Sequence, residues 1–153
     1  MPRRLNRGEI WLAELRPTRG HEPAAACPVV IISTNTFNHG PTDRVFVLPV
    51  TQTDRRIPLH VPIDPPEGGV AARSYIVCDA LCSMAKECLG PRAWGRVSAA
   101  TFHKVGDHLC LLMALSVSPP SLLDRTPVAA WWRAMGGWEA LEPEVNDTDP
   151  PQG

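Results

Sequence analysis

The stretch Cys27-Pro28-Val29-Val30-Ile31-Ile32-Ser33 decides how the rest of the chain is interpreted. A proline is followed by an unbroken apolar run rich in β-branched residues, which is typical of a buried strand. The surrounding chain has 153 residues, of which 44% are hydrophobic and 20% are charged. These values are those of a soluble globular protein of about one domain. We therefore expect one sizeable core that contains this segment as a strand.

Short segments on both sides of this strand also have strand character, and the 17 prolines of the chain separate many of them. From residue 99 onward the apolar residues recur at spacings of three and four, which indicates a helix. Ser98 is suited to cap its first turn. The expected strands are 9–15, 29–33, 44–50, 57–63, 74–78 and 83–86, followed by a connector over 90–95, a candidate last strand around Arg96 and a helix over about 99–115.

This order of elements predicts a mainly β fold, a small β-barrel sealed by the C-terminal helix. Pro119-Pro120 would close this unit, so we place its domain at 1–117. A helical extension is expected over 118–138, because Thr126 can cap a helix over 126–135 and Pro127 suits its first position. The acidic residues 139–153 are predicted to be disordered.

The charge and cysteine content bear on nucleic-acid contact and on metal binding. The last fifteen residues hold five acidic and no basic residues, which leaves 15 basic against 11 acidic residues in the remainder. This balance permits contact with a nucleic acid without requiring it. The five cysteines are expected to be reduced thiols, and their spacing fits no structural zinc site. With no membrane-spanning run and no secretory signal, we expect a cytoplasmic protein.

No nucleophile elbow, phosphate-binding glycine loop or HExxH motif is present, so motif chemistry alone names no reaction. Six segments within residues 7–115 nevertheless resemble, in order, the MazF/PemK family of toxin ribonucleases. These segments are Arg7-Gly8-Glu9-Ile10-Trp11, Pro17-Thr18-Arg19-Gly20-His21-Glu22, Pro28 to Ser33 with Asn35, Leu48-Pro49-Val50-Thr51, 69–79, and Gly95-Arg96-Val97-Ser98 with the following leucine-rich helix.

The resemblance implies an SH3-like barrel of the PemK/CcdB type that forms a homodimer and binds a cognate antitoxin protein. It also implies an mRNA interferase, which cleaves single-stranded RNA without metal or cofactor and leaves 2′,3′-cyclic phosphate and 5′-hydroxyl ends. Thr51 matches the family's catalytic threonine or serine, and Glu22 is the expected proton acceptor or orienting group. The expected RNA-binding residues are Thr18, Arg19, His21, Gln52, Arg55 and Arg56.

Cys27 stands where the family usually has a catalytic arginine. A thiol near its reference pKa is mostly neutral at pH 7 and donates only weak hydrogen bonds, so it cannot act as a guanidinium does. Three alternatives stay open. Arg19, Arg55 or Arg56 reaches the site, His21 or His60 supplies acid–base chemistry, or the chain is a weak or inactive homologue that acts by binding antitoxin or RNA.

A competing interpretation comes from the CcdB-type toxins, which share the barrel but inhibit DNA gyrase and cleave nothing. A role in binding alone would fit Cys27. Trp131, Trp132 and Trp138 near the end of the chain are compatible with this interpretation, since those toxins carry a tryptophan at a C-terminal helical tip. The strand motifs resemble the ribonuclease branch more closely.

Overall fold

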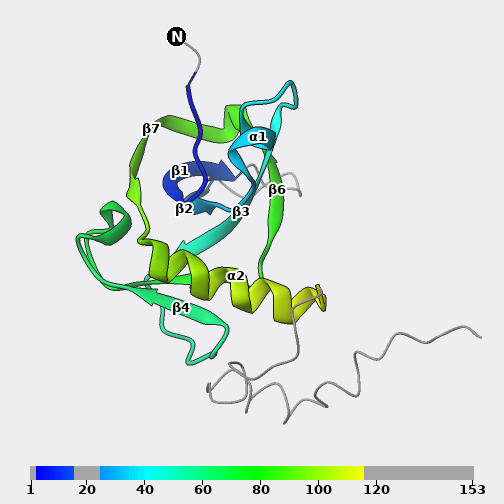
Figure 1. Ribbon diagram of the computed structural model, residues 1–153. Coiled ribbons are helices and arrows are strands. Elements are labelled where there is room, and N and C mark those ends of the chain that lie inside the picture. The colour runs from blue at the N-terminus through cyan, green and yellow to red at the C-terminus, as the bar shows by residue number, and fades with distance from the viewer. Residues whose placement is uncertain (1–2, 16–24, 116–153) are drawn as a thin grey trace, which may run out of the picture.

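The computed structural model describes residues 3–15 and 25–115 (Figure 1). The predicted helix at 126–135, the rest of the extension over 118–138 and the acidic segment 139–153 lie outside the described residues. The loop that carries Thr18, Arg19, His21 and Glu22 lies outside them as well.

In the described part of the chain, seven strands form an antiparallel sheet in the order β4-β5-β3-β2-β1-β7, with β6 also pairing with β3. The strands are β1 (Glu9–Leu15), β2 (Ala25–Ile31), β3 (Arg44–Thr51), β4 (His60–Ile63), β5 (Ser74–Val77), β6 (Cys82–Ala85) and β7 (Leu89–Arg96). The helices are α1 (Asn35–Asn38) and α2 (Ala99–Met113), and two short 3-10 turns are η1 (Glu67–Gly69) and η2 (Lys86–Cys88). The mainly β fold with a C-terminal helix is therefore confirmed.

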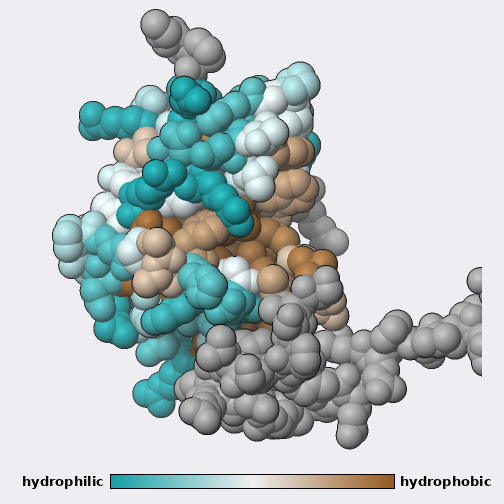
Figure 2. Space-filling model, viewed as in Figure 1, coloured by the Kyte–Doolittle hydropathy of each residue, from teal (hydrophilic) through white to brown (hydrophobic). Residues whose placement is uncertain are grey.

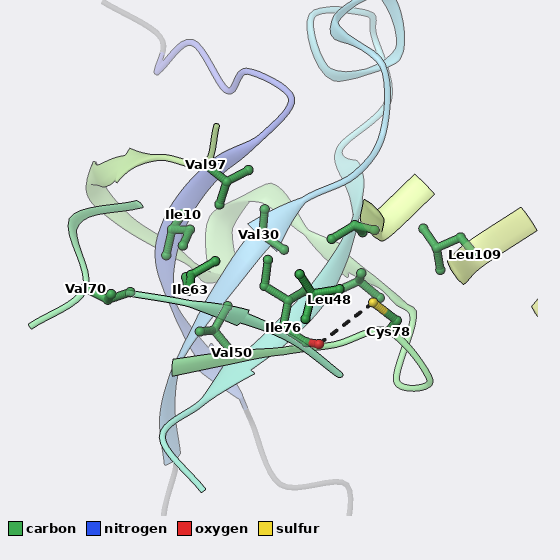
Figure 3. Packing of buried hydrophobic residues seen from close by; sticks show 12 residues of the cluster. Ile10, Val30, Leu48, Val50, Ile63, Val70, Ile76, Cys78, Val97 and Leu109 are labelled. Atoms are coloured by element: carbon green, nitrogen blue, oxygen red, sulfur yellow. Dashed lines mark hydrogen bonds between the residues drawn. The ribbon is translucent and has the colours of Figure 1, made fainter. Parts of the chain in front are cut away.

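The core lies between the curved sheet and α2, which crosses β4 (Figure 1, Figure 3). It contains Ile10, Val30, Leu48, Val50, Val61, Ile63, Val70, Ile76, Cys78, Val97, Val105 and Leu109. A second apolar cluster covers the other face of β1, β2 and β3, and it contains Leu5, Trp11, Ala13, Val29, Ile31, Val45, Val47, Met84 and Leu89. Because β2 is buried on both faces over residues 29–31, its sequence shows an unbroken apolar run instead of alternation.

The predicted connector at 90–95 is wrong, because these residues belong to β7, which pairs with β1 from Leu89 to Arg96. Pro91 argues against a strand in the sequence, because proline cannot donate a backbone hydrogen bond. It is tolerated here because β7 lies at the edge of the sheet. Packing explains why residue 95 is a glycine, since a Cβ there would lie 2.7 Å from the carbonyl carbon of Gly68. The two register shifts along β7 also hide the alternation that sequence patterns depend on.

Other expected boundaries move by a few residues. β2 begins earlier than predicted, at Ala25, and ends at Ile31. β4 begins at His60 instead of residue 57, after a loop in which Arg56 has a positive φ of 54°. The predicted cap of α2 is confirmed, since the Ser98 hydroxyl accepts a hydrogen bond from the Thr101 N–H at 3.1 Å.

Candidate active site

Cys27 lies on β2 and Thr51 lies on the neighbouring strand β3. The pairing of β2 with β3 sets Val30 opposite Leu48 and Val29 opposite Pro49. The same register, if continued two residues further along each strand, would set Cys27 opposite Thr51. The Cys27 Sγ lies 3.8 Å from the carbonyl oxygen of the preceding β3 residue, Val50. The structure therefore brings together the two positions that the resemblance selected.

Residues on the neighbouring strands are paired with Cys27 and with Thr51, and together they form a row across the sheet. Cys27 pairs with Ala13 on β1, while Thr51 pairs with Tyr75 on β5, which in turn pairs with Pro62 on β4. Directly opposed residues of an antiparallel sheet share one face. Ala13 is buried, the three middle residues are half-buried and Pro62 is exposed, so the row runs from the interior to the surface. We call Cys27, Thr51 and Tyr75 the outer row.

The outer row points away from the main core. Val50 and Ile76, which adjoin Thr51 and Tyr75 in sequence, are 2% and 0% exposed and belong to that core (Figure 3). Successive side chains of a strand point to opposite faces. Thr51 and Tyr75 therefore present their side chains on the outer face of the sheet, opposite the main core, where both are half-buried.

The thiol of Cys27 supplies no charge to this row. Burial raises its pKa and outweighs the opposing hydrogen bond at Val50, and the nearby Cys82 raises the pKa further. The thiol also lies 3.3 Å from the carbonyl oxygen of Pro28. A neutral thiol is a poor nucleophile and a weak hydrogen-bond donor. The electrostatic role expected of an arginine at this position is therefore absent from Cys27.

Thr51 ends β3, and its hydroxyl is oriented by the chain that follows. The Oγ1 accepts a hydrogen bond from the N–H of Thr53 at 3.2 Å. One lone pair is occupied in this way, so the hydroxyl proton stays available for donation to a phosphate oxygen. Thr51 can thus act as a fixed hydrogen-bond donor on the outer face.

The predicted RNA-binding residues Gln52, Arg55 and Arg56 are exposed in the loop directly after Thr51. The backbone N–H of Arg56 donates to the Asp54 carboxylate at 2.8 Å, which stabilises the turn. Within the part of the chain that the structure describes, no hydrogen bond or ion pair joins these three side chains to Thr51. Their position near the site is inferred only from their closeness to Thr51 in the sequence.

His60 is a poor fit to the acid–base role that the sequence left open for it. It lies on β4, is 7% exposed, and its Nε2 is 3.1 Å from the Asp79 carboxylate. Its Nδ1 is buried without a hydrogen-bond partner among the described residues. Among the described residues its side-chain partner is Asp79, which lies outside the outer row.

Sequence reasoning missed Tyr75 and its neighbour Arg73. The Arg73 guanidinium lies 5.9 Å from the centre of the Tyr75 ring, and its Nη1 is 3.1 Å from the Asp64 carboxylate. The resemblance identified residues 69–79 only as a strand. Alternation indicates that Tyr75 points outward, but only the strand pairing shows that it adjoins Thr51.

A separate open pocket, with a volume of about 510 Å³, lies at the other end of β2. Its lining includes Arg7, Asn35, Arg96, Phe102 and His103. The Arg7 guanidinium stacks on Phe102, 4.6 Å from the ring centre, and the Gly8 N–H donates to the Ile31 carbonyl. Of the predicted catalytic and RNA-binding residues that the structure describes, which are Cys27, Thr51, Gln52, Arg55 and Arg56, none lines this pocket.

The described residues were compared with the requirements of a metal site and of a membrane-spanning helix. Within residues 3–15 and 25–115, no group of three or more His, Cys, Asp or Glu residues is placed to hold a metal ion. None of the helices in the described part of the chain has the length and apolar character needed to cross a membrane.

Several solved structures are similar to this chain. An endoribonuclease in complex with its cognate antitoxin, from a mycobacterial species, is 27% identical, with a TM-score of 0.60 over 74% of this chain and 98% of that chain. The MazE–MazF complex of Deinococcus radiodurans shares the fold at 21% identity, with a TM-score of 0.65 over 74% and 99% of the two chains. The toxin MazF-mt6 of Mycobacterium tuberculosis is 24% identical, with a TM-score of 0.60 over 71% and 99%.

The match to a protein family covers the same part of the chain. The family model described as PemK-like, MazF-like toxin of type II toxin–antitoxin system matches residues 6–113, which include every described strand and the whole of α2. The chain therefore belongs to the PemK-like, MazF-like toxins of type II toxin–antitoxin systems.

Proposed function

We propose that this toxin is an endoribonuclease that cleaves single-stranded RNA at the outer row. The observation that carries this proposal is the direct pairing of Thr51 with Tyr75, together with the Cys27 Sγ lying 3.8 Å from the carbonyl oxygen of Val50, the residue before Thr51. The mycobacterial protein that is 27% identical to this chain is an endoribonuclease, which supports the same activity here.

In the proposed reaction the 2′-hydroxyl oxygen of one nucleotide forms a bond to the adjacent phosphorus, and the bond from phosphorus to the 5′ oxygen breaks. The products are a 2′,3′-cyclic phosphate and a 5′-hydroxyl. The Glu22 carboxylate takes the 2′ proton, and His21 supplies a proton to the leaving oxygen. The Thr51 hydroxyl donates to an oxygen of the pentacovalent phosphorus, where negative charge accumulates.

Positive charge at this phosphorus must come from residues other than Cys27. Arg19, Arg55 and Arg56 are the proposed sources, with Thr18 and Gln52 as further RNA contacts. Loss of one preorganised donor typically costs about 10²–10³ in rate. We therefore expect cleavage that is slow compared with a toxin that has an arginine at the Cys27 position.

A second candidate is supported by the neutral state of the Cys27 thiol. In this alternative the chain is a weak or inactive homologue that binds antitoxin, RNA or gyrase without cleavage. The two candidates differ in whether Thr51 is needed for RNA scission, because a binding protein makes no use of a hydroxyl aimed at the reacting phosphorus.

The proposed partners are a second copy of the chain and a cognate antitoxin, in the cytoplasm. Two of the similar structures are complexes with an antitoxin, which supports a partner of this kind. We propose that residues 1–117 form the toxin domain and that 118–138 form a helical extension, followed by an acidic tail over 139–153. The end of the family match at residue 113 supports a toxin domain that stops near this point.

The test is to incubate the purified full-length chain with a long single-stranded RNA in EDTA, beside a Thr51→Ala control. Fragments with 5′-hydroxyl ends that are lost in the Thr51→Ala variant would support the proposal. Absence of fragments at high protein concentration would overturn it in favour of the binding protein.

A further inference from the structure

We propose that Tyr75 and Arg73 form a nucleotide-binding pair beside Thr51, in which the Tyr75 ring stacks on an RNA base and the Arg73 guanidinium binds a neighbouring phosphate. This inference rests on the proposed function, since it assigns residues to the same RNA. It also provides a cation on the outer face that Cys27 does not provide.

Tyr75 lies next to the proposed site of cleavage. It is directly opposite Thr51 in the pairing of β5 with β3. Neighbouring strands lie about 4.8 Å apart, which is less than the length of one nucleotide. A phosphate that accepts a hydrogen bond from Thr51 therefore has its own base or an adjacent base within reach of the Tyr75 ring.

Arg73 is oriented toward the Tyr75 ring. It precedes β5 and is two residues from Tyr75, so the two side chains share one face of the sheet. The Arg73 guanidinium lies 5.9 Å from the centre of the Tyr75 ring. An arginine and an aromatic ring on a shared face are the combination that single-stranded nucleic acids require, one for the phosphate and one for the base.

Both side chains are available to a ligand. Tyr75 is half-buried, and its backbone is held between β3 and β4, so the ring is presented from a rigid element. The carboxylate partner of Arg73 is Asp64, and the side chains of this pair are 56% and 62% exposed. Exposed ion pairs of this kind stabilise a fold only weakly, so a phosphate can replace the carboxylate at small cost.

The experiment uses the full-length chain with Thr51→Ala, so that RNA is bound without being cleaved. Affinity for a fluorescent mixed-sequence single-stranded RNA is measured by anisotropy at several salt concentrations. Arg73→Gln is expected to weaken binding and to reduce the slope of log affinity against log salt by about 0.7, the value for one phosphate contact on a single strand.

The Tyr75 variants separate stacking from charge. Tyr75→Leu is expected to weaken binding roughly 5- to 150-fold with an unchanged salt slope, while Tyr75→Phe keeps the ring and the affinity. Asp64→Asn is expected to tighten binding, because it removes the carboxylate that competes with phosphate for Arg73. The matched control is Arg92→Gln, an exposed arginine on β7, which should change neither affinity nor slope.

Each outcome decides a different question. If the Thr51→Ala protein does not bind RNA, both this inference and the proposed function fail. If it binds RNA and the Arg73→Gln variant keeps the full salt slope, or Tyr75→Phe loses as much affinity as Tyr75→Leu, the nucleotide-binding pair is overturned while the proposed function stands. Thermal unfolding of each variant shows that a loss of binding is not a loss of fold.

Discussion

Cys27 occupies the position at which the proposed site would need a charged hydrogen-bond donor, but its side chain is a neutral thiol. Its Sγ lies 3.8 Å from the carbonyl oxygen of Val50, the residue before Thr51, yet burial keeps its pKa raised. If the proposed site is correct, the backbone at this position is close enough to Thr51 for an arginine to contact the reacting phosphate, whereas the neutral thiol cannot stabilise negative charge. Substitutions at this one position test whether the site has been identified correctly.

Cys27→Arg is expected to raise the rate of RNA cleavage by about 10²–10³, because it adds a fixed cation next to Thr51. Single-turnover cleavage with excess protein measures this rate directly. Cys27→Ser is the matched control, since it keeps the size of the side chain and adds no charge, and its rate should stay close to that of the parent. An active parent that gains nothing from the arginine would show that Cys27 lies away from the reacting phosphate.

His108 gives the fold a dependence on pH. Burial lowers its pKa, although the Leu59 carbonyl, which it contacts at 3.1 Å, and the Asp107 carboxylate both raise it, while Lys104 lowers it. The unfolded chain therefore binds the proton more readily than the folded chain. The contribution of His108 to stability is fully present above its ordinary pKa of 6.5 and is lost as the pH falls below that value.

The measurement is the urea midpoint at a pH above 7 and at a pH near 5. The midpoint of the parent should fall over this range, and that of His108→Gln should fall less, because glutamine does not titrate. Equal falls in the two proteins would assign the acid sensitivity to groups other than His108.

At the scale of elements, the sequence predicts strands well where they are buried and poorly where they are irregular. The run at 27–33 predicts its strand correctly because both faces of β2 are covered, so every residue of its central part is apolar. β7 escapes prediction because Pro91, two glycines and two register shifts remove its alternation. Its strand character depends on β1, which is more than seventy residues away in the chain.

The arrangement of the candidate site could likewise be predicted only in part from the sequence. The resemblance selected Thr51 and Cys27, but no pattern along the chain shows that β2 and β3 place them near each other. Tyr75 enters the site through the pairing of β5 with β3, and Arg73 enters through its contact with the Tyr75 ring. Such contacts between distant segments follow from register, which sequence periodicity does not specify.

The packing of β7 on η1 can be tested at Gly95. A Cβ at this position would come within 2.7 Å of backbone atoms of Gly68 and Gly69, which cannot yield as a flexible side chain can. Gly95→Ala is therefore expected to destabilise the protein by about 1–3 kcal/mol, as overpacking typically does. Urea unfolding provides the measurement.

Gly106→Ala is the control for this substitution. Gly106 lies within α2, and a Cβ there would meet nothing within 4 Å. Alanine at an unstrained helical position is expected to stabilise the protein by about 0.5–1 kcal/mol. The two substitutions are chemically identical, so opposite signs would isolate the close approach of β7 and η1 as the cause, and equal effects would contradict it.

At the scale of the whole molecule, the surface of this chain is not uniformly polar. Hydrophobic residues are exposed across the middle of the face that carries α2 (Figure 2). Phe37 on α1 and Phe46 on β3 form an aromatic pair with ring centres 5.6 Å apart, and they are 36% and 41% exposed. Contiguous exposed aromatic residues commonly mark a surface that binds another protein.

We expect this aromatic pair to lie in the interface of the proposed homodimer. Phe46→Ser should then weaken dimerisation by about 30-fold or more, since truncation of a central aromatic residue costs roughly 2 kcal/mol or more. Light scattering coupled to gel filtration, over a series of protein concentrations, measures the dimer fraction. Trp94→Ser is the control, because Trp94 is 44% exposed on β7 and does not belong to this pair. A dimer that Phe46→Ser leaves intact and Trp94→Ser dissociates would place the interface on β7.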